Sequence, residues 1–161
     1  MSRPSSAQRD GNGHSGRRVG HRRRRAARRL AIDLLYQADV TGQDPQQVME
    51  EWRQARRDVL PYAEEIVNGV ESQRQHIDRI LGSNSEEWAV HRMAAVDRAI
   101  LRVACYELGA GVPPAVVINE AVEAAKELST EDSGRFINGL MGKIARTLQD
   151  GGQDSRGSRT P

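Results

Sequence analysis

The chain is poor in several residue types, and each shortage narrows the classes of protein to which it can belong. It has one cysteine, Cys105, so an internal disulfide and a metal site with a second thiol are excluded. No apolar run approaches the ~20 residues of a membrane span. The N-terminus has arginines but no signal-peptide pattern. We therefore predict a cytoplasmic protein with no membrane segment, in which Cys105 is packed among apolar neighbours.

Lysine is scarce as well, since Lys126 and Lys143 are the only two and 22 of the 24 basic residues are arginine. GC-rich codon usage alone can produce such a bias, so the positions of the arginines are more informative than their number. Ten of them lie in residues 1–36 beside two acidic residues, which gives this segment a net charge of +8 and leaves −6 for the remainder. This asymmetry favours a polyanion at the basic end and a different, basic partner at the acidic end.

Six arginines are clustered at the leading end of an amphipathic segment that continues to Tyr36. They are Arg22, Arg23, Arg24, Arg25, Arg28 and Arg29. A guanidinium can bind a phosphate through two hydrogen bonds, stack on a base and keep its charge at cellular pH. The cluster therefore indicates a nucleic-acid-binding arm, in preference to a charge run that is merely solvated.

Strand patterns are lacking throughout. Val116–Ile118 is the only β-branched run, and it opens a longer helical period. Elsewhere apolar residues recur at i, i+3, i+4 and i+7, which is the spacing of one helix face. We predict an all-α domain with about seven helices. The polar residues 1–20 and 149–161 have almost nothing to bury and are predicted to be disordered tails.

Catalytic and cofactor motifs are also missing. Gly11–Gly16 matches the dinucleotide pattern G-x-G-x-x-G, but no strand precedes it and no helix follows directly. The four histidines are scattered without ligand spacing, and paired carboxylates such as Glu64-Glu65 are typical of solvated helix faces. We predict no catalytic residue, no cofactor and no metal site.

Four separated blocks carry a more specific pattern. They are the R-x-x-A-R-x-L-A-x-x-L-L-Y segment that ends at Tyr36, then Val96–Leu108, Val117–Leu128 and Glu131–Leu140. In order and spacing these blocks resemble the bacterial transcription antitermination factor NusB family, over roughly residues 21–146.

The resemblance implies two three-helix bundles packed across one another, here at about residues 21–82 and 85–148. It also implies a non-enzymatic adaptor that binds boxA-type RNA in nascent ribosomal RNA transcripts together with the small-ribosomal-subunit protein NusE. The heterodimer then joins other Nus factors on RNA polymerase. A homodimer of the free protein stays open.

The resemblance further implies roles for single residues. Arg24, Arg25 and Arg28 occupy the family's arginine-rich RNA-binding stretch, and this sequence offers Arg22, Arg23 and Arg29 as additional contacts. Phe136 falls where the family places an aromatic against RNA bases, with Asn138 beside it. Tyr36 and Asp97 fall at the protein-partner surface. From the residues alone, Phe136 and Tyr36 are equally well explained by packing, and Asp97 by the helix dipole.

A third group of polar residues is expected to form ion pairs or hydrogen bonds between helices, because polar groups near apolar helix faces need partners. They are Arg102, Glu107, Asn119 and Glu120. Gly69 and Gly139 interrupt helical patterns and are expected to allow close helix packing.

Two other functions stay open. The same helical module resembles the RNA-binding extension of ribosomal-RNA cytosine methyltransferases, although the chain ends before a methyl-donor domain. A basic-armed helical DNA-binding protein is the second alternative. A groove-reading second or third helix would itself be basic, whereas the arginines here lie ahead of and within the first helix.

Overall fold

The computed structural model describes residues 13–86 and 88–154, and this part of the chain contains helices and no strands. The elements are α1 (Gly13–Thr41), α2 (Pro45–Gln54), α3 (Pro61–Ser72), α4 (Arg74–Asn84), the 3₁₀ helix η1 (Val90–Arg92), α5 (Ala95–Gly109), α6 (Pro114–Leu128) and α7 (Glu131–Asp154). The all-α prediction is confirmed, and seven α-helices are present in the described residues.

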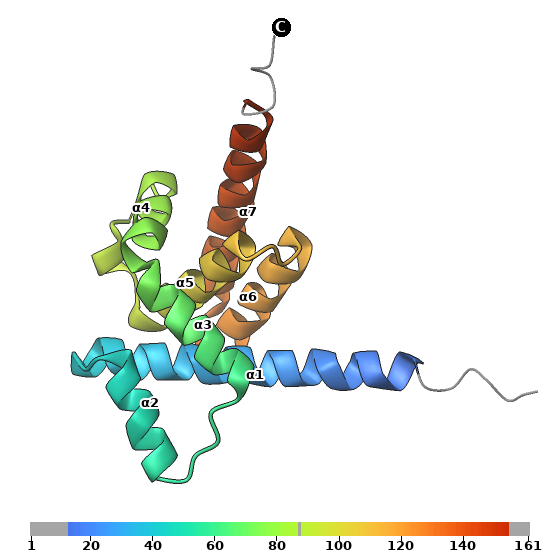
Figure 1. Ribbon diagram of the computed structural model, residues 1–161. Coiled ribbons are helices and arrows are strands. Elements are labelled where there is room, and N and C mark those ends of the chain that lie inside the picture. The colour runs from blue at the N-terminus through green and yellow to red at the C-terminus, as the bar shows by residue number, and fades with distance from the viewer. Residues whose placement is uncertain (1–12, 87, 155–161) are drawn as a thin grey trace, which may run out of the picture.

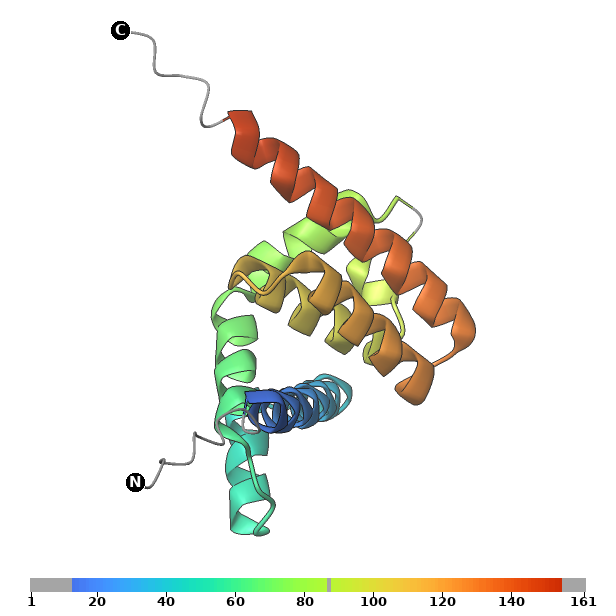
Figure 2. The same ribbon diagram turned by 90° about the vertical axis from the view of Figure 1, so that its right-hand side faces the viewer.

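Helix α1 is the long helix against which both halves of the molecule pack (Figure 1). On one side it packs against α2 and α3, and on the other it packs against α5, which also contacts α4, α6 and α7. Figure 2, which views α1 end-on, shows α3 alongside it and the α5, α6 and α7 layers beyond. We expected α4 in the first bundle, but it packs against α5 and α7 in the second.

Local sequence sets where several helices begin. Proline occupies a first-turn position in α2, α3 and α6, where its missing N–H leaves no hydrogen bond unmade. Asp44 caps α2, since its carboxylate accepts a hydrogen bond of 2.8 Å from the backbone N–H of Gln46. Thr130 caps α7 in the same way, accepting from the N–H of Ser133 at 3.1 Å.

The outer helices are longer than the sequence predicted. Helix α1 begins at Gly13 and α7 ends at Asp154, so residues 13–20 and 149–154 are helical where we expected disordered tails. A helix that is already nucleated by packing adds one hydrogen bond for each residue fixed, so extending it is easier than starting it. The rest of the two predicted tails, residues 1–12 and 155–161, lies outside the described residues.

One glycine permits a close helix contact. A Cβ at Gly69 of α3 would lie 2.0 Å from Cε2 of Tyr106 in α5, so only glycine fits at this crossing. The expectation for Gly139 is wrong, because a Cβ there would meet no atom within 4 Å.

Cys105 is buried in α5, and burial raises the pKa of its thiol to about 12, as befits a packed residue. Within the described range, every helix is too short or too polar to cross a membrane.

Candidate nucleic-acid interface

The N-terminal half of α1 presents a cluster of cations to solvent. Arg22, Arg23 and Arg24 are all exposed, and no ion pair joins them to any residue in the described part of the chain. The guanidinium of Arg24 lies 5.7 Å from the ring centroid of Tyr62 in α3, within the range of a cation–π contact. No local pattern in the sequence points to Tyr62, because the contact joins two different helices, α1 and α3.

Arg25 and Arg29 bind carboxylates on α6. Arg25 donates from Nε and Nη2 to the two oxygens of Glu120 at 3.1 and 3.0 Å, and Arg29 Nε donates to Glu127 at 2.9 Å. Half of the Arg25 side chain remains exposed (48%), against 19% for Arg29. Arg25 thus keeps part of its surface for a ligand, while Arg29 mainly attaches α1 to α6.

Burial acts to raise the pKa of Glu120, but the hydrogen bonds and charge of Arg25, with the charges of Arg28 and Arg29, hold it below its ordinary value of 4.5. Glu120 is therefore ionised at neutral pH although only 7% of its side chain is exposed. This agrees with the structural role expected for it.

Arg28 is not on the surface that the sequence predicted. Only 5% of its side chain is exposed, and its Nε donates to both oxygens of Glu107 in α5 at 2.8 and 2.9 Å. Helical spacing places Arg28 one turn from Arg24 but next to Ala27, on the edge that faces the core. Arg28 is therefore corrected from a phosphate contact to a residue that joins α1 to α5.

Phe136 and Asn138 both lie on α7, one and three residues after Arg135. Phe136 is half-buried, packs against the core and lines a hollow of about 370 Å³ with Lys143. Asn138 is exposed and lines a second hollow, between α6 and α7. The Phe136 side chain is partly covered by the core and partly exposed. It is therefore compatible both with packing in the core and with stacking on an RNA base.

The two residues expected at the protein-partner surface differ in exposure. Tyr36 is 37% exposed on α1, with the more exposed Val40 one turn further along. Asp97 is only 7% exposed, and its carboxylate accepts a hydrogen bond of 2.8 Å from the hydroxyl of Ser133 in α7. Asp97 is therefore a link between α5 and α7, which corrects its placement as an open contact.

The remaining structural assignments are mostly confirmed. Arg102 donates to both oxygens of Asp78 in α4 at 2.9 and 3.0 Å, and Glu107 accepts from Arg28 as described. Asn119 is exposed, so the buried role expected for it is wrong. Among residues 13–86 and 88–154, no three His, Cys, Asp or Glu side chains are grouped closely enough to hold a metal ion.

The amino-acid sequence is similar to those of known proteins. Residues 25–146 match the model of the NusB family. The transcription antitermination protein NusB of Rubrobacter xylanophilus is 47% identical over 120 residues, which cover 73% of this chain and 86% of the relative. NusB of Saccharopolyspora erythraea is also 47% identical, over 128 residues that cover 76% of this chain and 86% of the relative.

Solved structures with the same fold include NusB from T. maritima, which is 33% identical with a TM-score of 0.67 and covers 76% of this chain and 90% of that chain. A crystal structure of the antitermination factors NusB and NusE in complex with double-stranded RNA is 26% identical with a TM-score of 0.69. It covers 78% of this chain and 98% of that chain.

Proposed function

The chain belongs to the NusB family, and from this membership we propose that it is a transcription antitermination factor that binds boxA-type RNA together with NusE. It acts in the cytoplasm as a non-enzymatic adaptor, through which the RNA and NusE join the other Nus factors on RNA polymerase. The proposal is supported by a solved relative that contains NusB, NusE and RNA in one complex.

RNA binding is supported mainly by the exposed guanidinium groups of Arg22, Arg23 and Arg24, which are clustered at one end of α1. Each guanidinium can neutralise a phosphate and release counterions, which gives affinity without sequence choice. Arg25 contributes through the exposed half of its side chain, whereas Arg29 is a secondary contact because α6 already holds it.

Sequence choice requires contacts to bases. Phe136 offers the open part of an aromatic ring for stacking, and Asn138 offers an amide that can both donate and accept hydrogen bonds. Both lie on α7, which α6 connects to the arginine-bearing helix through Glu120 and Glu127. An RNA strand that follows the arginines across α6 would reach them.

NusE is assigned to the surface around Tyr36, on the C-terminal half of α1 and therefore away from the arginines. Tyr36 and Val40 expose apolar area there, and an aromatic side chain with a polar tip is favoured at protein interfaces. Asp97 is bonded to Ser133 in α7, so its role is to hold α5 and α7 together and not to contact NusE directly.

The test is a binding competition. A labelled single-stranded boxA-type RNA is bound to the protein, alone and with NusE, and is displaced by unlabelled boxA RNA, by an RNA of shuffled sequence or by duplex DNA of equal length. We expect boxA RNA to displace most strongly and NusE to sharpen that preference. Equal displacement by duplex DNA would favour a DNA-binding protein instead.

A matched pair of variants locates the site. Affinity falls as the salt concentration rises. Replacing Arg22 and Arg24 with Gln is expected to make the slope of log affinity against log salt concentration shallower by about 1.4, since each lost contact to a single strand removes about 0.7. The control replaces Arg74 and Arg79 with Gln on α4, which Figure 1 shows far from the N-terminal end of α1. It removes the same charge and should leave the slope unchanged.

A further inference from the structure

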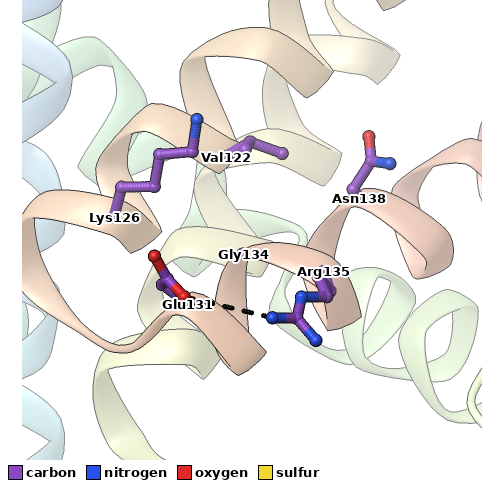
Figure 3. Close-up of a pocket in the computed structure, with 6 residues that line it drawn as sticks. All are labelled: Val122, Lys126, Glu131, Gly134, Arg135 and Asn138. Carbon is purple, nitrogen blue, oxygen red and sulfur yellow. Dashed lines mark ion pairs between the residues drawn. The ribbon is translucent and has the colours of Figure 1, made fainter.

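A hollow of about 440 Å³ lies between α6 and α7, beside Asn138 (Figure 3). Val122 and Lys126 line it from α6, and Glu131, Gly134, Arg135 and Asn138 line it from α7. Its size falls in the range of small-molecule sites. The sequence did not single out Lys126, Glu131, Gly134 or Arg135, because the hollow exists only where two helices meet.

Gly134 lines this hollow from α7 and places no side chain in it. Gly134 is buried, and a Cβ at that position would meet nothing nearer than Cγ of Lys126 at 3.9 Å. A methyl group would therefore fit at residue 134, and Val122 and the alkyl stem of Lys126 border the hollow with apolar surface. The apolar surface of Val122 and of the Lys126 stem suits the face of a flat ring.

The rim carries groups of the opposite kind. The carboxylate of Glu131 and the amide of Asn138 can form hydrogen bonds with the polar edge of a ligand ring. Lys126 and Arg135 can bind phosphate groups. Glu131 and Arg135 approach each other to only 4.0 Å and are largely exposed, at 90% and 77%. Such a loose surface pair contributes little, so a ligand can displace it at small cost.

The hollow also lies on the route already assigned to RNA. Lys126 is adjacent to Glu127, which binds Arg29, and Arg135 lines both this hollow and the one beside Phe136. A ring inserted at Gly134 and another stacked at Phe136 would thus lie on either side of Arg135. A duplex hides its base faces by stacking, so an unpaired strand fits this arrangement.

We propose that the hollow beside Gly134 binds one unpaired RNA base that carries an exocyclic amino group, with the ring against Val122 and the stem of Lys126 and the amino edge toward Glu131. The proposal rests on the proposed function and adds a base site to it. A carboxylate accepts from an amino group, whereas uracil presents a carbonyl at that position.

The test fills the hollow from its floor. Gly134→Ala and Gly134→Leu place a methyl group and then a larger side chain at the hollow. A Cβ at this position meets no atom closer than 3.9 Å, and both substitutions raise the helix propensity. The control is Gly142→Ala, further along the same helix, where a Cβ meets only the end of the flexible Arg146 side chain at 3.6 Å. All three variants are expected to melt at or above the temperature of the unsubstituted chain.

Affinity is measured with a labelled single-stranded boxA-type RNA. Gly134→Ala and Gly134→Leu are expected to bind progressively more weakly, with a loss of between about 5-fold and about 100-fold for the Leu variant, as for one lost base stack. Gly142→Ala is expected to bind normally. Equal affinity of the Gly134 and Gly142 variants overturns the base site and leaves the proposed function standing, whereas an unsubstituted chain that binds no RNA overturns both.

Abasic RNAs identify the base. Removing bases one at a time should reveal a position whose loss weakens binding to the unsubstituted chain but not to Gly134→Leu, because the two changes remove the same contact. At that position cytosine, adenine or guanine should bind more tightly than uracil, the one base without an amino group, and Glu131→Ala should abolish this preference. Additive losses at every position, or no preference over uracil, would overturn the proposal.

Discussion

Arg28 and Glu107 are 79 positions apart in the chain, yet the Nε of Arg28 donates to both carboxylate oxygens of Glu107 inside the protein, at 2.8 and 2.9 Å. The hydroxyl of Tyr62 donates to the same carboxylate at 2.7 Å, so one buried acid joins α1, α3 and α5. Burial and this hydrogen bond raise the pKa of Tyr62 to about 12. The cluster fixes the helix that carries the exposed arginines.

Replacing Arg28 with Ala is therefore expected to destabilise the fold. The loss leaves the buried carboxyl group of Glu107 without its main partner, and breaking a buried pair in this way costs about 3–5 kcal/mol. Chemical denaturation measures the free energy of unfolding. Arg24→Ala is the control, one helical turn away. It should weaken RNA binding and lower the stability by at most about 1 kcal/mol, the size of its exposed cation–π contact with Tyr62. Equal stability of the two variants would contradict the buried role.

The Arg25–Glu120 pair predicts a pH dependence of stability. The pKa of Glu120 is held below 4.5 in the folded chain, so the pair stabilises the fold above that value and the contribution is lost as pH falls through the lowered pKa. The difference in unfolding free energy between the unsubstituted chain and Glu120→Gln should shrink as pH is lowered from about 6 to about 3. A difference that stays constant over this window would show that the ionised form is not favoured.

Phe136 permits a separation of stacking from packing. Phe136→Leu keeps an apolar side chain against the core, so the unfolding free energy should change by less than about 1.5 kcal/mol. The aromatic face is lost, and RNA binding should weaken by about 1–3 kcal/mol. Melting and RNA titration on one sample decide between the two roles. Normal RNA binding by this variant would assign the ring to packing alone.

The partner surface is best probed at Tyr36. Tyr36→Ala should reduce capture of purified NusE while leaving RNA binding by the protein alone unchanged, because the residue is exposed on α1 beyond the C-terminal end of the arginine cluster. Asp97→Lys is unsuited to this purpose, since it would bury an ammonium against Ser133 and destabilise the fold. Full NusE capture by Tyr36→Ala would remove this residue from the interface.

Periodicity and charge distribution in the sequence were sufficient for the helical class, for the basic end of the first helix and for a packed Cys105. These properties depend on neighbours within about one helical turn, which a sequence displays directly. The same local signals placed Gly69 at a close helix contact and Arg102 and Glu107 in buried pairs, because polar groups on apolar faces require partners.

Only the tertiary structure decided which arginines face solvent. Arg24 and Arg28 are one turn apart and look equivalent in the sequence, but the carboxylate that buries Arg28 comes from α5, and the acids that hold Arg25 and Arg29 come from α6. Asp97 was misplaced for the same reason, since Ser133 reaches it from α7. The hollow at Gly134 likewise arises between two helices, and its shape depends on a missing side chain whose surroundings no local pattern encodes.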